Sequence, residues 1–400
     1  MSYRPLLAAE VTPSTAELYQ IIKDMRAELD AVKKVLAEER AQRTGTASVE
    51  QQLKAQQEQI DAMANATASD TSSALHLGGY GELHYNNLSA KDSANDLKEI
   101  DFHRFVLYAG YDFTDRLRLH SELELEHAIA SAEDAGEIEL EQAFIEYDVG
   151  KNWTTRAGLM LIPMGILNET HEPTTFYGVE RNDVESIIIP GTWRGAGIGS
   201  TLRWDNGLSW DVMLHEGLAI ETSGSDAYRV RSGQQEASEA LAADLAVTTR
   251  LRYTGIPGLE LGVAVQYQND ASQIHGDGID SGLLYEAHAI YNHGPLGIRA
   301  LYSAWDFAGA GIAAANSDSQ TGWYLEPSWR VSEPLGFYAR YEDVQAARGQ
   351  DRFTQWEGGM NYWPHPQVVA KLDYRKREHD RVADSGLDFK GFDLGLGYRF

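Results

Sequence analysis

Residues 75–400 are divided into segments in which apolar and polar residues alternate, and this pattern limits most strongly what the chain can form. Every second residue from Phe392 to Phe400 is apolar or aromatic, and so is every second residue of 259–268; 117–126 alternates in the same way except at Ser121. A period of two predicts β-strands. Segments of about ten residues have the length that a tilted strand needs to cross a bilayer.

Sixteen such segments can be counted. We expect strands at residues 75–86, 99–113, 117–128, 137–149, 153–163, 195–204, 208–217, 241–254, 259–268, 283–291, 296–306, 321–331, 336–344, 353–362, 368–377 and 391–400.

The connections between these segments alternate between short and long. Short ones, such as 205–207 (Asp-Asn-Gly), consist of hairpin-forming residues. Long ones, such as 164–194 and 218–240, are polar and mostly acidic. Short periplasmic turns and long external loops are typical of bacterial outer-membrane barrels. We therefore predict an all-β transmembrane barrel of 16 antiparallel strands. A soluble sandwich or propeller is the alternative, but neither requires this alternation or outward aromatic residues at strand ends.

Composition narrows the choice further. No window approaches the roughly 18–20 apolar residues of a membrane-spanning helix, and the mean hydropathy is −0.40. The net charge of −26 argues against nucleic acid as a partner, because phosphate binding needs a basic surface. Cysteine is absent, which excludes disulfides and thiolate metal sites and suits an oxidising cell envelope.

The N-terminal part has a different period. Residues 12–65 are predicted to form a periplasmic α-helical coiled coil and residues 66–74, rich in Ala, Ser and Thr, a linker. The heptad positions that we expect to associate in a trimer are Leu18, Ile22, Met25, Leu29, Val32 and Leu36. An amphipathic helix packed on its own domain is the other interpretation. Residues 1–11 are interpreted as the remnant of a signal peptide or as a disordered start.

The polar faces of the strands predict a water-filled lumen that carries charges of both signs. The loop at 164–194 is expected to fold inward and constrict it, because an exposed Ile187-Ile188-Ile189 run would be costly. The candidate pore-lining and constriction residues are Arg104, Arg118, Arg156, Glu169, His171, Glu172, Arg181, Asp183, Arg194, Arg203, Arg250 and Arg252. Such charges can also pair between strands and only stiffen the wall.

No cofactor, metal site or catalytic residue is predicted. His127, His171 and Glu172 are of metal-binding types, but two adjacent residues of a strand cannot point the same way. Ser, His, Asp and Glu are abundant, yet no spacing singles out a catalytic triad. A barrel hydrolase is kept only as an alternative.

Three stretches, 102–107 (FHRFVL), 141–147 (EQAFIEY) and 156–165 (RAGLMLIPMG), resemble the phosphate-selective porin O/P family. In that family an acidic strand is followed by a strand with a Gly-Gln motif and by a long third loop, and the N-terminal heptads are similar to those of its trimeric members. The resemblance implies a homotrimer, a third-loop constriction and often anion selectivity through inward arginines. Met160 and Leu161 depart from the Gln and basic residue that are usual there.

Together these features predict passive diffusion of small hydrophilic solutes, anionic ones such as phosphate or carboxylates, across the outer membrane. The acidic external loops favour the alternative of a general pore with weak cation preference. Tyr398 and Phe400 resemble the terminal aromatic signal that the outer-membrane insertion machinery recognises. Outer-membrane lipid and that machinery are therefore expected partners, and the coiled coil could also tether the protein to peptidoglycan.

Overall fold

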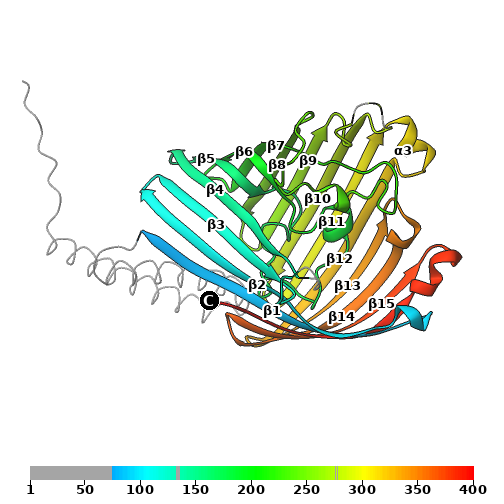
Figure 1. The fold of residues 1–400 in the computed structure, drawn as a ribbon. Coiled ribbons are helices and arrows are strands. Elements are labelled where there is room, and N and C mark those ends of the chain that lie inside the picture. Colours follow the sequence, from blue (N-terminus) through cyan, green and yellow to red (C-terminus); the bar gives the residue numbers. More distant parts are fainter. Residues whose placement is uncertain (1–73, 132–135, 275, 277) are drawn as a thin grey trace, which may run out of the picture. The chain divides into compact units, whose positions relative to one another are not determined.

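The computed structural model describes residues 74–131, 136–274, 276 and 278–400, and its strands form a closed antiparallel barrel (Figure 1). Each strand pairs with its neighbours in sequence, and the first and last strands pair with each other. The predicted 16-stranded barrel is thus confirmed. The predicted coiled coil at 12–65, with its seam from Leu18 to Leu36, and most of the linker lie outside the described residues. Among the described residues, no helix is long and apolar enough to span a membrane.

The strands are β1 (Leu75–Ala90), β2 (Leu97–Thr114), β3 (Leu117–Glu126), β4 (Ile138–Gly150), β5 (Trp153–Leu161), β6 (Arg194–Arg203), β7 (Leu208–His215), β8 (Ala246–Ile256), β9 (Leu259–Gln268), β10 (Ser281–His293), β11 (Leu296–Ala308), β12 (Ser319–Ser332), β13 (Leu335–Gln345), β14 (Arg352–His365), β15 (Val368–His379) and β16 (Phe389–Arg399). Short helical turns occupy the long connections: η1 (Ser93–Asn95), η2 (Val184–Ile188), η3 (Arg231–Gly233), α3 (Ala310–Ala314), η4 (Gly349–Asp351) and η5 (Val382–Leu387).

Several strands differ from the prediction at the ends that face the long loops. β1 continues to Ala90 and β2 begins at Leu97, so little of the predicted loop 87–98 remains. Hydrogen bonding between strands continues past the membrane-spanning stretch, in which one face must be apolar. The strands are therefore longer than the alternating pattern. β8 begins at Ala246 and not at residue 241. There the amide of Leu241 bonds to the Gln235 side chain, which removes it from the strand ladder.

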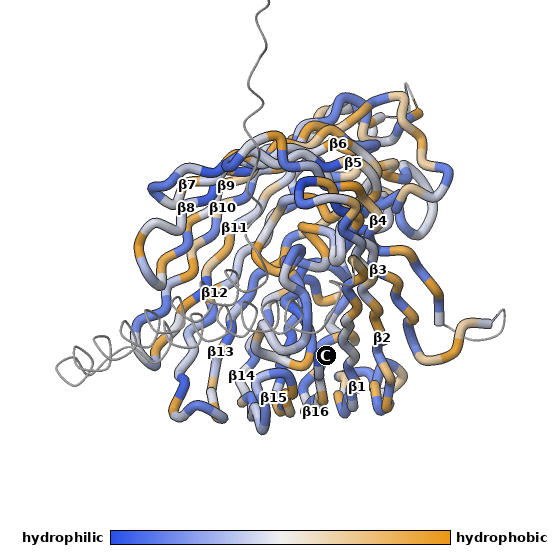
Figure 2. The backbone as a smooth tube through the Cα atoms, turned by 90° about the vertical axis from the view of Figure 1, so that its left-hand side faces the viewer, coloured by the Kyte–Doolittle hydropathy of each residue, from blue (hydrophilic) through white to orange (hydrophobic). Residues whose placement is uncertain are grey.

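The outer surface carries the expected aromatic residues. Trp153, Trp210 and Trp329 are between 42% and 52% exposed on the barrel exterior. Figure 2 shows hydrophilic and hydrophobic residues following one another along the strands. Phe400, one of the two predicted signal residues, also faces outward at 57% exposure. Its backbone exchanges two hydrogen bonds with Gly79, of 2.9 and 3.0 Å, at the seam between β1 and β16.

The interior contains an apolar cluster as well as charges. The third loop, residues 162–193 between β5 and β6, packs its buried Ile188 and Trp193 against inward side chains of β11 and β12. The indole Nε1 of Trp305 donates a hydrogen bond to the Ile188 carbonyl at 2.9 Å. Ile188 and Ile189 are fully buried, as expected for this apolar run. The third loop is therefore held to the far wall by packing as well as by polar contacts.

Gly322 on β12 leaves the space that this packing needs. A Cβ atom there would lie 2.9 Å from Ile188 and 3.0 Å from Val184. We expect Gly322→Val to destabilise the protein by about 1–3 kcal/mol, because the added atoms overpack the contact. Thermal unfolding in detergent measures this effect. Gly358→Val is the control, since its Cβ would meet nothing closer than 3.6 Å; equal losses in both variants would contradict the prediction.

Candidate functional site: the charged lumen beside the third loop

The third loop reaches strands on the opposite side of the barrel (Figure 1). The amide of Val179 donates to Asp373 on β15, and the amide of Asp183 donates to Glu342 on β13, each at 2.7 Å. Lys371 of β15 in turn donates to the Gly178 carbonyl at 2.7 Å. Backbone groups of a non-strand segment inside a barrel need such partners, since no ladder satisfies them. Polar side chains of the wall therefore fix the path of this loop.

Most predicted pore arginines form ion pairs. On neighbouring strands, Arg118 and Arg156 share Glu146 at 2.8 and 2.7 Å. Arg104 is 2% exposed and bonds to Glu82 at 2.5 Å. In these three cases the charges cancel locally and stiffen the wall.

The other candidate residues form ion pairs or hydrogen bonds that involve the long loops. Arg194 contacts Glu139 and Glu236 at 2.6 and 2.8 Å, and Arg250 contacts Asp211 at 2.9 Å and also Glu169 of the third loop. Asp183 pairs with Arg377 at 2.5 Å, Glu172 accepts from the Tyr108 hydroxyl at 3.3 Å, and Arg181 donates to Thr192 at 2.7 Å. Glu169, Glu172 and Asp183 thus connect the third loop to the barrel wall. Arg194 instead joins β6 to β4 and to the loop before β8, and Arg181 bonds within the third loop.

A second set of inward arginines lacks carboxylate partners. Among the described residues, none of the four makes an ion pair within 4.0 Å; the set, which we name the arginine collar, comprises Arg203, Arg252, Arg299 and Arg330. Each lies within five residues of a short turn, at the end of the barrel opposite the long loops. Arg299 donates to the Thr175 carbonyl, and Arg330 donates to the Glu333 carbonyl while stacking 3.8 Å above the Trp363 ring. The alternation of apolar and polar residues predicts that all four face the lumen, although only Arg203 and Arg252 are among the candidate pore-lining residues given above.

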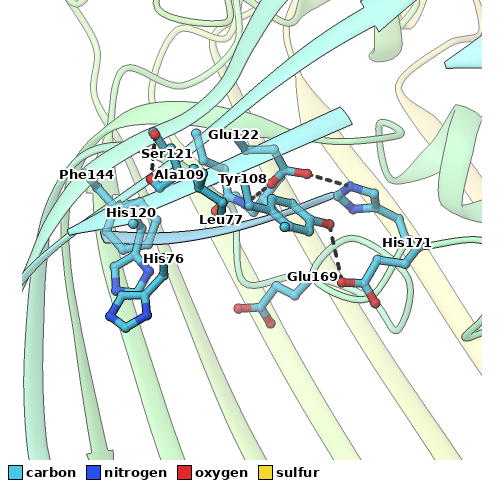
Figure 3. Close-up of a pocket in the computed structure, with 15 residues that line it drawn as sticks. His76, Leu77, Tyr108, Ala109, His120, Ser121, Glu122, Phe144, Glu169 and His171 are labelled. Atoms are coloured by element: carbon cyan, nitrogen blue, oxygen red, sulfur yellow. Dashed lines mark hydrogen bonds and ion pairs between the residues drawn. The ribbon is translucent and has the colours of Figure 1, made fainter. Parts of the chain in front are cut away.

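The opposite side of the lumen holds an acidic cluster next to a cavity of about 370 Å³ (Figure 3). His171 of the third loop and Glu122 of β3 line this cavity and point toward each other. The buried Glu141 of β4 completes the cluster. Burial holds the pKa of His171 well below its usual value.

Glu141 points inward because of a β-bulge. β3 pairs Glu122 with Gln142 but Leu123 with Leu140, which leaves Glu141 as the extra residue of β4. A bulge lets two successive residues face the same side. Strict alternation from Ile145 and Tyr147 would have placed Glu141 toward lipid, so the sequence analysis missed it. The bulge has a sign in the sequence: the apolar residues lie at even positions up to residue 140 and at odd positions from residue 145.

A closed barrel with a charged lumen, and with a long loop bonded across it, is the architecture of an outer-membrane channel of the porin class. Two solved structures support this fold. An anion-selective porin from Comamonas acidovorans matches with a TM-score of 0.58 and 12% identity, covering 82% of this chain and 99% of that one. OmpT of Vibrio cholerae, folded in vitro and solved in a trimer form, matches with a TM-score of 0.52 and 13% identity, covering 82% and 100%.

Residues 75–400 match the family described as phosphate-selective porin O and P, and the chain belongs to that family. An uncharacterized protein of Aquifex aeolicus (strain VF5) is 28% identical over 354 residues, covering 78% of each chain. Family and fold together define an outer-membrane channel and point away from an enzyme.

Proposed function

We propose that this channel carries small anionic solutes, such as phosphate or carboxylates, by passive diffusion. The observation that carries the proposal is the arginine collar. Its four guanidinium groups face the lumen without carboxylate partners among the described residues, whereas most other inward arginines are neutralised. The Comamonas neighbour is itself an anion-selective porin, which agrees with the proposal.

Electrostatics gives the expected size of the effect. A unit charge about 10 Å from a solute ion is worth roughly 0.4 kcal/mol in water. Four such charges favour an anion by more than 1 kcal/mol before screening, and a difference of 1.4 kcal/mol is about tenfold in an equilibrium constant. The Debye length near 0.1 M salt is about 10 Å, so the preference should weaken as salt rises.

The third loop is proposed to form the constriction. Its contacts with Asp373, Glu342 and Lys371 bring backbone of residues 178–183 to the opposite wall. A solute must then pass through the space that this segment leaves. The candidates in the loop, including Glu169, Glu172 and Arg181, would act chiefly by fixing its position through the pairs described above.

A general pore with weak cation preference is the second candidate. The net charge of −26 and the acidic long loops favour it, since negative charges at the external mouth would attract cations at low salt.

Reversal potentials across planar bilayers under a KCl gradient distinguish the two candidates. We expect an anion preference that weakens between about 0.1 and 1 M salt, because the collar is screened over this range. A cation preference at every salt concentration would overturn the anion proposal.

A homotrimer is proposed as the assembly, with residues 12–65 on the periplasmic side and the barrel surrounded by outer-membrane lipid. The Vibrio neighbour was solved in a trimer form, and the heptad positions of the N-terminal segment suit self-association. The same recordings test this, since three pores that insert together should close in three equal conductance steps.

A further inference from the structure

Three buried side chains converge where β3, β4 and the third loop meet. His171 Nε2 lies 3.9 Å from Glu122 Oε1 and 3.9 Å from Glu141 Oε2. The three residues are 4%, 3% and 1% exposed, and their ligand-type atoms all lie within 4.8 Å of one another. Charged groups are rarely buried to this degree unless they are paired or bind a metal.

The hydrogen bonds of His171 fix which of its nitrogens is free. Nδ1 lies 2.8 Å from the backbone carbonyl of Asn168, and a carbonyl can only accept, so Nδ1 carries the proton. In the neutral ring Nε2 then carries the lone pair, and it faces Glu122 and Glu141. Metal-binding histidines are usually held in this way, with one ring nitrogen donating to a carbonyl and the other facing the ion.

The carboxylates facing this lone pair lack donors. Among the described residues, no N–H or hydroxyl group reaches Glu122 Oε1 or either oxygen of Glu141, and the side chains that contact the Glu141 carboxyl group are those of Glu122 and Glu124. Arg104 is nearby, but its hydrogen bonds go to Glu82 and to the His171 carbonyl. Unsatisfied buried acceptors cost free energy, so a converging set of them points to a positive ion between them.

The surroundings orient these acceptors. Gln142 donates to Glu122 Oε2 and leaves Oε1 turned toward His171. The β-bulge places Glu141 beside it. Such outer contacts are what hold metal ligands in place. The neighbouring cavity, which Glu122 and His171 line, gives an entry path and room for water as a further ligand.

We propose that Glu122, Glu141 and His171 form a binding site for a divalent first-row transition-metal cation, which joins the third loop to the barrel wall. One imidazole with carboxylates suits Zn²⁺ or Mn²⁺. Ligand atoms about 2.1 Å from a tetrahedral ion are about 3.4 Å apart, so the 3.9 Å separations need only small side-chain rotations. The bound ion would also cancel negative charge on the cavity wall.

Calorimetric titration of the chelator-treated full-length protein with Zn²⁺, and separately with Mn²⁺, tests the site. We expect one tightly bound ion per chain. Glu141→Gln and His171→Gln should each weaken binding at least tenfold, and Gln142→Leu should weaken it about 10–100-fold through the outer contact.

The control is His127→Ala. His127 belongs to a separate, half-exposed group with Asp101 and His103, and its loss should leave the tight site intact. Loss of tight binding in His127→Ala with retention in His171→Gln would place the ion in that other group and overturn the proposal. Absence of tight binding in the wild-type protein would overturn it as well.

Thermal unfolding separates a metal site from carboxylates that merely share a proton. Zn²⁺ should raise the unfolding temperature of the wild-type protein but not of Glu141→Gln. In chelator, Glu141→Gln should unfold no earlier than the wild type, since it removes one of the converging charges. An earlier transition in chelator, with no Zn²⁺ effect on the wild type, would indicate a shared proton and exclude the ion. These measurements do not depend on which solute the channel carries.

Discussion

Replacing the four arginines of the arginine collar by glutamine is expected to abolish the anion preference of the channel. Among the described residues these groups make no ion pair within 4.0 Å, so direct contact with a carboxylate does not cancel their charge, and glutamine keeps much of the side-chain bulk. Their combined field is worth more than 1 kcal/mol at low salt. The ratio of anion to cation permeability should fall about tenfold, read from the reversal potential under a KCl gradient at about 0.1 M.

The matched control is Arg116→Gln. Arg116 also lies beside a short turn, but its guanidinium bonds to the Val149 carbonyl and stacks over the Tyr147 ring, which faces outward. Its replacement should leave the reversal potential unchanged. A quadruple variant that keeps the wild-type permeability ratio would show that selectivity originates elsewhere in the lumen.

Arg340→Met is expected to give the largest loss of stability. Arg340 is 1% exposed and pairs with Glu326, Glu342 and Glu357 at 3.0, 3.3 and 2.7 Å. Its removal leaves three carboxylates buried with no shared cation. Breaking a buried pair from one side costs about 3–5 kcal/mol. Glu342 also accepts a hydrogen bond from the Asp183 amide, so the loss of Arg340 should make the third loop more mobile.

Two measurements check this outcome together. The unfolding temperature in detergent should drop, and the single-channel conductance should become larger or noisier as the loop loses its anchor. Arg381→Met is the control, since this arginine is 62% exposed in a long loop and pairs with Asp384 at 3.5 Å. If Arg340→Met and Arg381→Met were equally stable, the carboxylate cluster would not depend on Arg340.

The fold could be predicted because a barrel in a membrane needs alternation along every strand and asymmetric connections. Ion pairs between neighbouring strands depend also on register. Asp211 opposes Arg250, and Glu146 opposes both Arg118 and Arg156, but a change of one residue in a turn would separate them. Alternation along the strands predicts that these arginines face the lumen but does not predict their partners.

The contacts of the third loop could not be predicted from the sequence. Val179 bonds to Asp373, 194 residues further along the chain, through a path that no periodicity encodes. Glu141 was missed for a local reason, since a bulge reverses the parity on which the assignment depended. The third loop and the bulge form the candidate site, and irregular segments of this kind have no periodic pattern from which their contacts can be predicted.

Closure of the barrel has a consequence for how the chain acquires its structure. Asn86 of β1 bonds to Asp393 of β16, 307 residues away in sequence. Until β16 has been synthesised, one edge of β1 has no partner, and every partial sheet keeps two rows of unpaired backbone groups that invite aggregation. Contacts of such long range also slow folding. A partial sheet therefore never reaches the edge-free state of the finished barrel, and pairing of β1 with β16 is the step that removes both exposed edges.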